Sequence, residues 1–209
     1  MKIDILTLFP EMFKGPFDYS ILKRAEEKKL IKIEIHNLRD WAEDKHKTVD
    51  DRPFGGGAGM VLKVGIIDKA LQSLKKRGAK VLLLDAAGEK FTQKKALKLS
   101  KIKHLIIIAG HYEGIDHRVR EHLADEIISI GDYVLTGGEI PAMVIVDSVV
   151  RLIPGVVKEE SVKNESHTKR GYLEHPQYTR PEDYKGWKVP KALLSGNPKE
   201  IERWKKDLK

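Results

Sequence analysis

Short apolar runs, rich in isoleucine and leucine, recur through the first 155 residues of the chain. Around Ile33 the apolar residues alternate with polar ones, and this period of two is typical of a strand. Later runs are continuously apolar and bounded by glycine, as strands buried on both faces of a parallel sheet are. We therefore expect strands over residues 2–9, 31–35, 81–84, 105–109 and 127–130.

Segments with helical spacing separate these strands. Asp18 or Ser20 is placed to cap the first helix, and Gly78 is placed to end the second. Three apolar side chains of the first helix are expected on its inner face: Ile21, Leu22 and Ala25. We expect helices over residues 18–29, 66–74, 91–99, 116–123 and 139–152. Strands that alternate with helices indicate an α/β fold, with a mainly parallel sheet and flanking helices.

Glycine-bearing loops follow three consecutive predicted strands, over residues 85–88, 110–114 and 131–138. Ligands of parallel sheets bind at the carboxyl ends of the strands, and glycine lets the main chain approach a ligand closely. Main-chain groups in such loops can bind an adenine edge without charged side chains. One such loop alone is more simply a tight structural turn, but two that carry charged and aromatic residues, over 110–114 and 131–138, favour a ligand pocket.

The composition changes after Gly155. Residues 158–180 have few aliphatic side chains and no clear period, which is typical of a linker or of a loop that a partner orders. Structure returns near the end, because Asn197 is placed to cap a helix that runs to about Leu208. We therefore divide the chain into residues 1–155, 156–180 and 181–209.

The net charge of the chain is +8, which indicates a polyanionic partner. Residues 151–209 carry 14 Lys and Arg against 9 Asp and Glu, so the surplus gathers near the end of the chain. The alternative is a lysine-rich surface that serves solubility alone. The chain has no cysteine, no signal-peptide pattern and no apolar stretch near the roughly 20 residues of a membrane helix. We expect a cytoplasmic protein with no membrane partner.

Five motifs carry a resemblance to a known family: VDDRPFGGGAGM, GHYEGID, SIGDYVLTGGE, RLIPGV and HPQYTRP. In this order they resemble the bacterial tRNA (guanine-N1)-methyltransferase family, which belongs to the SPOUT class. The resemblance implies a deep trefoil knot in residues 1–155, which nothing in the periodicity predicts. It also implies S-adenosylmethionine as methyl donor, and tRNA as substrate, methylated on the guanine 3′ to the anticodon. A homodimer whose active site lies at the subunit interface is implied as well.

The family's contacts, carried across to this sequence, fall mainly in the three glycine-bearing loops. The predicted cofactor-binding residues are Leu84, Asp85, Ala86, Gly88, Gly110, Tyr112, Gly114, Ile130, Gly131, Asp132, Tyr133, Val134, Leu135, Gly137 and Gly138. Asp50, Tyr112 and Glu113 are the predicted contacts to the target guanine. The resemblance also implies that residues 156–180 are an interdomain linker that carries the catalytic residues. It implies that residues 181–209 are a short, truncated tRNA-binding domain.

Methylation of guanine at N1 requires a base that removes the N1 proton and a donor that stabilises charge at O6. Arg151 matches the family's arginine, and Glu165 stands where the family has its aspartate base. Without the resemblance, Arg151 is a cation at a helix end and Glu165 a solvated loop carboxylate. His167 is the second candidate for the base.

No metal site is predicted, because an activated methyl donor needs no Lewis acid, and the sequence leaves a role for Mg²⁺ open. The alternative function is a non-catalytic RNA-binding protein on the same SPOUT scaffold. Loss of the carboxylate at 165 and of the arginine at 151 would favour it, and both positions are filled here by competent groups.

Overall fold

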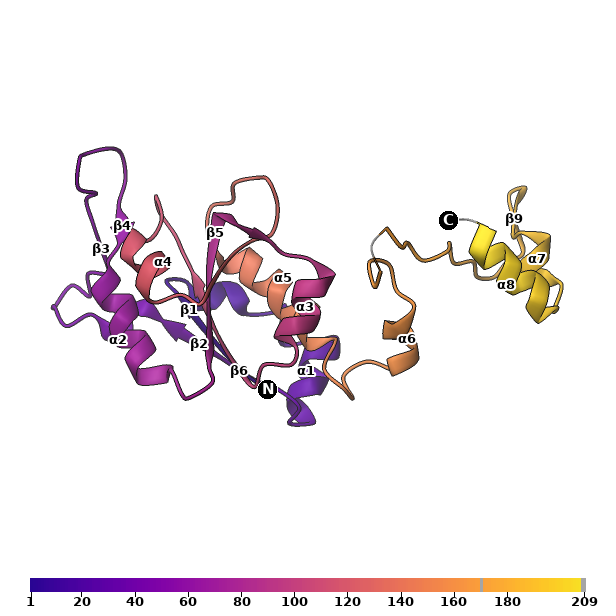
Figure 1. Cartoon of the computed structure of the whole chain (residues 1–209), viewed down its shortest axis with the longest axis horizontal. Coiled ribbons are helices and arrows are strands. Elements are labelled where there is room, and N and C mark those ends of the chain that lie inside the picture. The colour runs from indigo at the N-terminus through magenta and orange to yellow at the C-terminus, as the bar shows by residue number, and fades with distance from the viewer. Residues whose placement is uncertain (170, 208–209) are drawn as a thin grey trace. The chain divides into compact units, whose positions relative to one another are not determined.

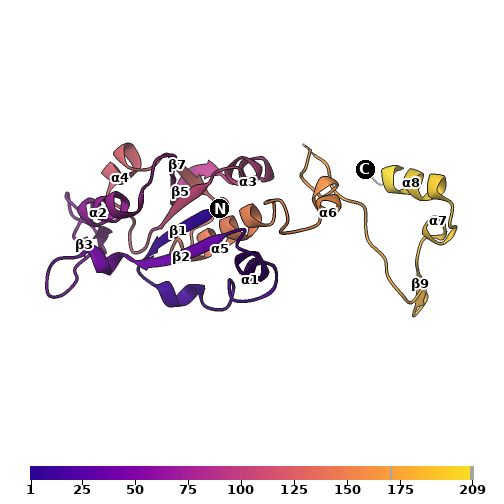
Figure 2. The same ribbon diagram turned by 90° about the horizontal axis from the view of Figure 1, so that it is seen from below.

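The computed structural model describes residues 1–169 and 171–207 and divides into two units at Glu159–Glu160. The first unit contains a sheet of five parallel strands, in the order β2-β1-β6-β5-β7, within the described residues. The strands are β1 (Lys2–Thr7), β2 (Lys32–Asn37), β5 (Lys80–Lys90), β6 (His104–Ala109) and β7 (Glu126–Ser129). All five strands expected from the sequence are therefore present, and Figure 2 shows β1 and β2 side by side.

Helices cover both faces of this sheet (Figure 1). Their bounds, with two short 3₁₀ helices, are η1 (Pro10–Phe13), α1 (Ser20–Glu27), η2 (Leu38–Trp41), α2 (Val64–Leu74), α3 (Gln93–Leu99), α4 (His117–His122) and α5 (Glu139–Val150). One buried cluster joins α1, α3 and α5 to one face, and a second joins α2 and α4 to the other. Every residue of β6 is buried, since it is a central strand covered on both sides, and this explains its continuous apolar run.

Three details of the expected helices are wrong. Tyr19 is the N-cap of α1 and makes no side-chain cap, whereas Asp18 accepts a hydrogen bond from the Gly15 N–H instead. Ile21 is 38% exposed, so only Leu22 and Ala25 of its predicted inner face are buried. Helix α2 ends at Leu74, and Gly78, with φ +83°, lies in the turn beyond it.

Strand β5 is longer than the predicted run 81–84. Its pairing with β7 is interrupted, since Leu84 and Glu89 both lie opposite Ile128. The residues between them bulge out of the ladder and form the loop expected over 85–88. A Cβ on Gly88 would lie 2.6 Å from the main chain of Ile128, so glycine is required here for close strand packing.

A short antiparallel ribbon, β3 (Asp50–Asp51) and β4 (Val61–Leu62), brackets the glycine-rich segment. The second unit, from Glu160 on, holds β8 (Asp183–Tyr184), β9 (Trp187–Lys188), α7 (Lys191–Leu194) and α8 (Pro198–Asp207), while α6 (Glu159–Lys163) spans the division. Asn197 caps α8 by accepting from the Lys199 N–H at 3.1 Å, as the sequence predicts. The expected last residue of that helix, Leu208, lies outside the described residues.

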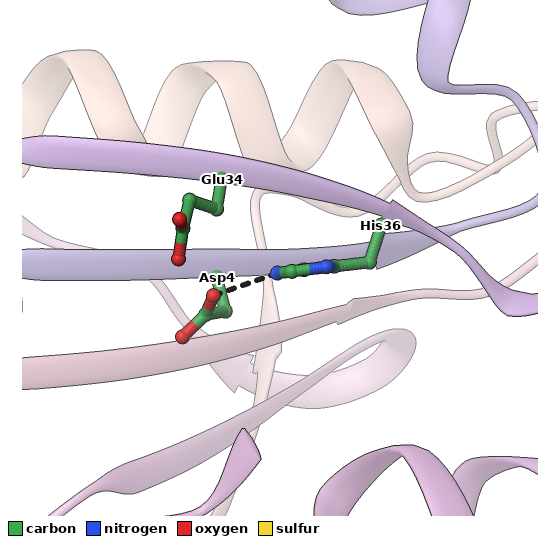
Figure 3. A group of neighbouring side chains, drawn as sticks. All are labelled: Asp4, Glu34 and His36. Carbon is green, nitrogen blue, oxygen red and sulfur yellow. Dashed lines mark hydrogen bonds and ion pairs between the residues drawn. The ribbon is translucent and has the colours of Figure 1, made fainter. Parts of the chain in front are cut away.

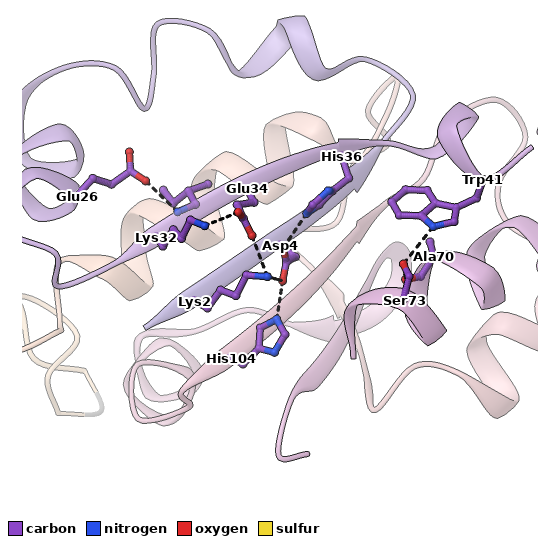
Figure 4. A network of polar contacts seen from close by, with 11 residues as sticks. Lys2, Asp4, Glu26, Lys32, Glu34, His36, Trp41, Ala70, Ser73 and His104 are labelled. Atoms are coloured by element: carbon purple, nitrogen blue, oxygen red, sulfur yellow. Dashed lines mark hydrogen bonds and ion pairs between the residues drawn. The ribbon is translucent and has the colours of Figure 1, made fainter. Parts of the chain in front are cut away.

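A buried carboxylate, Asp4, organises a polar network that involves strands β1 and β2 (Figure 3). Its side chain is fully buried, and the Nε2 atoms of His36 and His104 lie 2.7 and 2.5 Å from its two oxygens. The Lys2 ammonium lies 3.0 Å from Asp4 and 2.8 Å from Glu34, which joins the two carboxylates (Figure 4). Burial raises the pKa of Asp4, but hydrogen bonds from His36, His104 and Lys2 outweigh it and hold that pKa well below its usual range.

Among the described residues, Asp4, Glu34 and His36 form the one group of three side chains spaced as metal ligands are. The Lys2 ammonium already supplies positive charge to both carboxylates, so the network is balanced by the protein's own groups. No helix in the described part of the chain combines the length and the apolar character of a membrane span.

Candidate active site

A pocket opens at the carboxyl ends of β5, β6 and β7, where the three glycine-bearing loops meet. Thirteen of the predicted cofactor contacts line it: Leu84, Asp85, Ala86, Gly110, Tyr112, Gly114, Ile130, Gly131, Tyr133, Val134, Leu135, Gly137 and Gly138. Glu113 lines it too. The parallel sheet explains this convergence, because it places the ends of neighbouring strands at one edge.

The loop after β6 is held from two sides. Gly110 has the Ile115 side chain against it, since a Cβ there would lie 3.2 Å from Ile115 Cδ1. Tyr112 adopts a left-handed conformation, with φ +60°, which is uncommon for a residue other than glycine. The Arg39 guanidinium donates to the Tyr112 hydroxyl at 3.5 Å, so a segment far away in sequence supports this turn.

The glycine-rich segment packs directly on that loop. The Glu113 N–H donates to the Met60 carbonyl at 3.1 Å, and a Cβ on Gly59 would lie 2.4 Å from Glu113 Cγ. The GGGAG sequence therefore lies against the predicted guanine contact Glu113. Phe54, at the start of this segment, is fully exposed. Asp50 is half-buried in β3 opposite Leu62, and it is not one of the residues that line the pocket.

The loop after β7 closes the other side of the pocket. A Cβ on Gly138 would lie 2.7 Å from Ala109 Cα, and the Gly138 N–H donates to the Gly110 carbonyl at 2.7 Å. Glycine at 138 thus allows the main chains of two loops to touch. The Tyr133 ring lies over Gly131, where a Cβ would meet its Cε1 atom at 2.3 Å.

Two predicted cofactor contacts lie outside the lining. Gly88 is occupied in packing β5 against β7, as described above. Asp132 is turned outward, with 77% of its side chain exposed, and pairs with Lys90. Sequence reasoning grouped both with their loops, although each serves the loop's conformation in this structure.

Several lining residues were missed by the sequence analysis, and His111 is the most informative of them. Its Nδ1 is buried and has no hydrogen-bond partner among the described residues, and Glu139 Oε2 lies 3.7 Å away. The Phe9 ring packs on the imidazole, with 4.6 Å between ring centroids. Its position between two predicted contacts was the only signal in the sequence.

The two predicted catalytic residues lie apart from these loops in the chain. Arg151 is the C-cap of α5, at the opposite end of that helix from Gly138. Glu165 belongs to the second unit, where its carbonyl accepts from the Thr168 N–H and hydroxyl. His167 has a left-handed conformation, with φ +69°, in the same turn. The roles of Glu165 and His167 stay predictions.

Comparison with known proteins places this site in a family. The family model described as tRNA (Guanine-1)-methyltransferase TrmD matches residues 1–209. The chain belongs to the TrmD family. It is 59% identical to a tRNA (guanine-N(1)-)-methyltransferase of Dictyoglomus turgidum over 99% of this chain and 84% of that protein. A protein of the same name from Bacillus subtilis is 55% identical over 98% of this chain and 86% of its own length.

The charge of the pocket is unusual for a nucleotide site. Among its described lining residues there is no lysine or arginine, whereas Asp85, Glu113 and His111 can carry charge. A pocket of this composition does not suit a phosphate-bearing ligand, for which a positive side chain is usual. It suits a ligand that is neutral or positively charged and is held by main-chain groups.

Proposed function

We propose that the chain transfers a methyl group from S-adenosylmethionine to N1 of guanine in tRNA, at the position 3′ to the anticodon. The observation that carries the proposal is the pocket formed by the three loops of a TrmD-family chain. Its glycines expose main-chain groups, and its apolar walls include Leu84, Ile130 and Leu135. These features fit a nucleoside with a sulfonium group, which a pocket lined by lysine or arginine would repel. When bound, the cofactor supplies an activated methyl group.

The residues of this chain would supply the rest of the chemistry. In the proposal, Glu165 removes the N1 proton of guanine, and Arg151 stabilises the negative charge that moves toward O6. Glu113, which lies in the pocket and against Gly59, accepts from the guanine edge. Tyr112 fixes the turn that carries Glu113. A role for Mg²⁺ is not part of the proposal.

The position of Arg151 supports a site that two subunits share. Helix α5 starts beside the pocket at Glu139 and ends at Val150. Its twelve residues span about 18 Å, which is more than an arginine side chain can reach back. In the proposed homodimer, Arg151 and Glu165 of one subunit therefore serve the pocket of the other. The exposed Ile140 and Val144 on α5 supply an apolar surface for that contact.

The proposal includes the trefoil knot of the SPOUT class. It is supported by the contact between the loop after β7 and the loop after β6. Gly138 there lies against Ala109 and donates to the Gly110 carbonyl. A chain that threads another segment needs such close main-chain packing, and glycine provides it.

A methyl-transfer assay tests the function. Labelled S-adenosylmethionine and unmodified tRNA should give 1-methylguanosine with the wild-type chain. Glu165→Gln should lower kcat by roughly 10²–10⁴-fold, because the amide cannot take up the N1 proton. Raising the pH should restore part of that loss, since more of the guanine ionises unaided. His167→Phe is the matched control and should keep most of the activity. A near wild-type Glu165→Gln with an inactive His167→Phe would assign the base to the histidine.

A mixing experiment tests the shared site. Glu165→Gln and Gly137→Val chains, each impaired alone, should regain activity when their subunits exchange, because one of the two sites in the heterodimer is intact. Native mass spectrometry confirms the exchange. Exchange without recovery would mean that each site is built within one chain, and would contradict the dimer proposed here.

A further inference from the structure

A second buried carboxylate, Glu139, lies directly behind the wall of the pocket. It is the first residue of α5 and is 1% exposed. The Thr7 hydroxyl, at the end of β1, donates to Glu139 Oε1 at 2.7 Å. That hydroxyl also accepts from the Phe9 N–H at 2.9 Å, which directs its own proton toward Glu139. One of the two carboxylate oxygens is therefore firmly bound to the core of the sheet.

The other oxygen, Oε2, lies against the main chain that lines the pocket. A Cβ on Gly137 would lie 2.3 Å from Glu139 Oε2 and 2.5 Å from His111 Nδ1. Both Gly137 and His111 line the pocket, whereas Glu139 does not. Only a glycine backbone and an imidazole thus separate this oxygen from the ligand space. His111 Nδ1, at 3.7 Å, is too far away for a hydrogen bond to it.

A negative charge in this place acts on the pocket with little screening. The two carboxylates that line the pocket, Asp85 and Glu113, are exposed, so water and salt weaken their field. Glu139 is buried, and its field passes through protein of lower effective dielectric.

We propose that Glu139 makes the pocket discriminate between the methyl donor and the spent cofactor by charge. This inference rests on the proposed function. S-adenosylmethionine carries a sulfonium cation, whereas S-adenosylhomocysteine, which remains after transfer, has a neutral thioether. The two are otherwise the same molecule apart from the methyl group. A buried anion beside the pocket stabilises the first and not the second, so it favours donor binding and product release.

Calorimetry with both molecules on the full-length chain tests this inference. The wild-type chain should bind S-adenosylmethionine several-fold more tightly than S-adenosylhomocysteine. Glu139→Gln keeps the shape of the side chain and removes its charge. It should weaken binding of S-adenosylmethionine by about tenfold, and binding of S-adenosylhomocysteine by less than about twofold. Asp147→Asn is the matched control, because it removes an exposed charge two turns further along α5, and both affinities should stay unchanged.

The outcomes separate the two proposals. An equal loss of both affinities in Glu139→Gln would make Glu139 a packing residue and overturn the inference, while the pocket assignment would stand. Equal affinities in the wild-type chain would overturn it as well, and that measurement needs no variant to fold. Binding of neither molecule by the folded wild-type chain would overturn the proposed function. Glu139→Asp, which retains the charge, should retain the preference.

Discussion

Two buried carboxylates lie on or against strand β1, and their interaction partners differ greatly. Asp4 lies near the start of β1 and is surrounded by His36, His104 and Lys2. Glu139 meets the end of β1, three residues further on, through the single hydroxyl of Thr7. Both are almost wholly buried, yet one is fully paired by the protein and the other leaves an oxygen beside a pocket.

The difference separates a stabilising site from a binding site. A buried charge costs free energy unless donors compensate it, and at Asp4 three donors do so. At Glu139 one hydroxyl, that of Thr7, donates to the carboxylate, and the neighbouring His111 Nδ1 has no hydrogen-bond partner in the described part of the chain. Incompletely paired groups of this kind gather where a ligand completes them. Substitutions in the Asp4 network should therefore change stability, and those beside the pocket should change binding.

The largest expected effect on cofactor affinity is at the carboxyl ends of the strands. Gly137→Val places side-chain atoms where Glu139 Oε2 and His111 Nδ1 now lie. Overpacking of this kind costs roughly 1–3 kcal/mol, so the affinity for S-adenosylmethionine should fall by about 10–100-fold. Calorimetry measures the affinity, and thermal unfolding should still be cooperative. Gly65→Val is the control, because a Cβ there meets nothing within 4 Å. Unchanged affinity in a folded Gly137→Val chain would remove the pocket assignment.

The second effect is on stability, in the network around Asp4. Asp4→Asn removes the negative charge that His36, His104 and Lys2 share. Breaking a buried pair on one side typically costs about 3 kcal/mol or more, so the free energy of unfolding should fall by about that much. Chemical denaturation measures it. Asp68→Asn, on the exposed face of α2, is the matched control and should change stability by less than about 0.5 kcal/mol. Cofactor affinity should not change in either variant.

The third effect is the dependence of stability on pH. Because the pKa of Asp4 is held below its usual range in the folded state, the unfolded chain binds a proton more readily in acid. The contribution of Asp4 is therefore fully present above the unfolded pKa of about 4, and it is lost as the pH falls below that. Asp4→Asn should flatten the acid limb of a plot of unfolding free energy against pH. Glu126 and Asp116 also have lowered pKa values and remain in both chains, so both plots keep an acid limb. An acid limb as steep in Asp4→Asn as in the wild-type chain would contradict this prediction.

The parts of the molecule that local pattern decides were predictable from the sequence. The five strands, the bulge within β5 and the loops after β6 and β7 follow from apolar runs and glycines that are neighbours in the chain. The two carboxylate clusters were not predictable, because His104 meets Asp4 across 100 residues and Thr7 meets Glu139 across 132. No period or motif encodes such pairs. The outward turn of Asp132 was missed for the same reason, since its partner Lys90 lies on another strand.

The smallest expected effect distinguishes burial from mere pairing within the Asp4 network. Glu34 makes two ion pairs, with Lys2 at 2.8 Å and Lys32 at 2.5 Å, but its side chain is 32% exposed. Water can replace those partners, so Glu34→Gln should lower the free energy of unfolding by less than about 1 kcal/mol. The loss should shrink further at high salt, because exposed pairs are screened. Chemical denaturation at low and high ionic strength measures both. If Glu34→Gln lowered the free energy of unfolding as much as Asp4→Asn does, ion pairing rather than burial would account for the stability that this network provides.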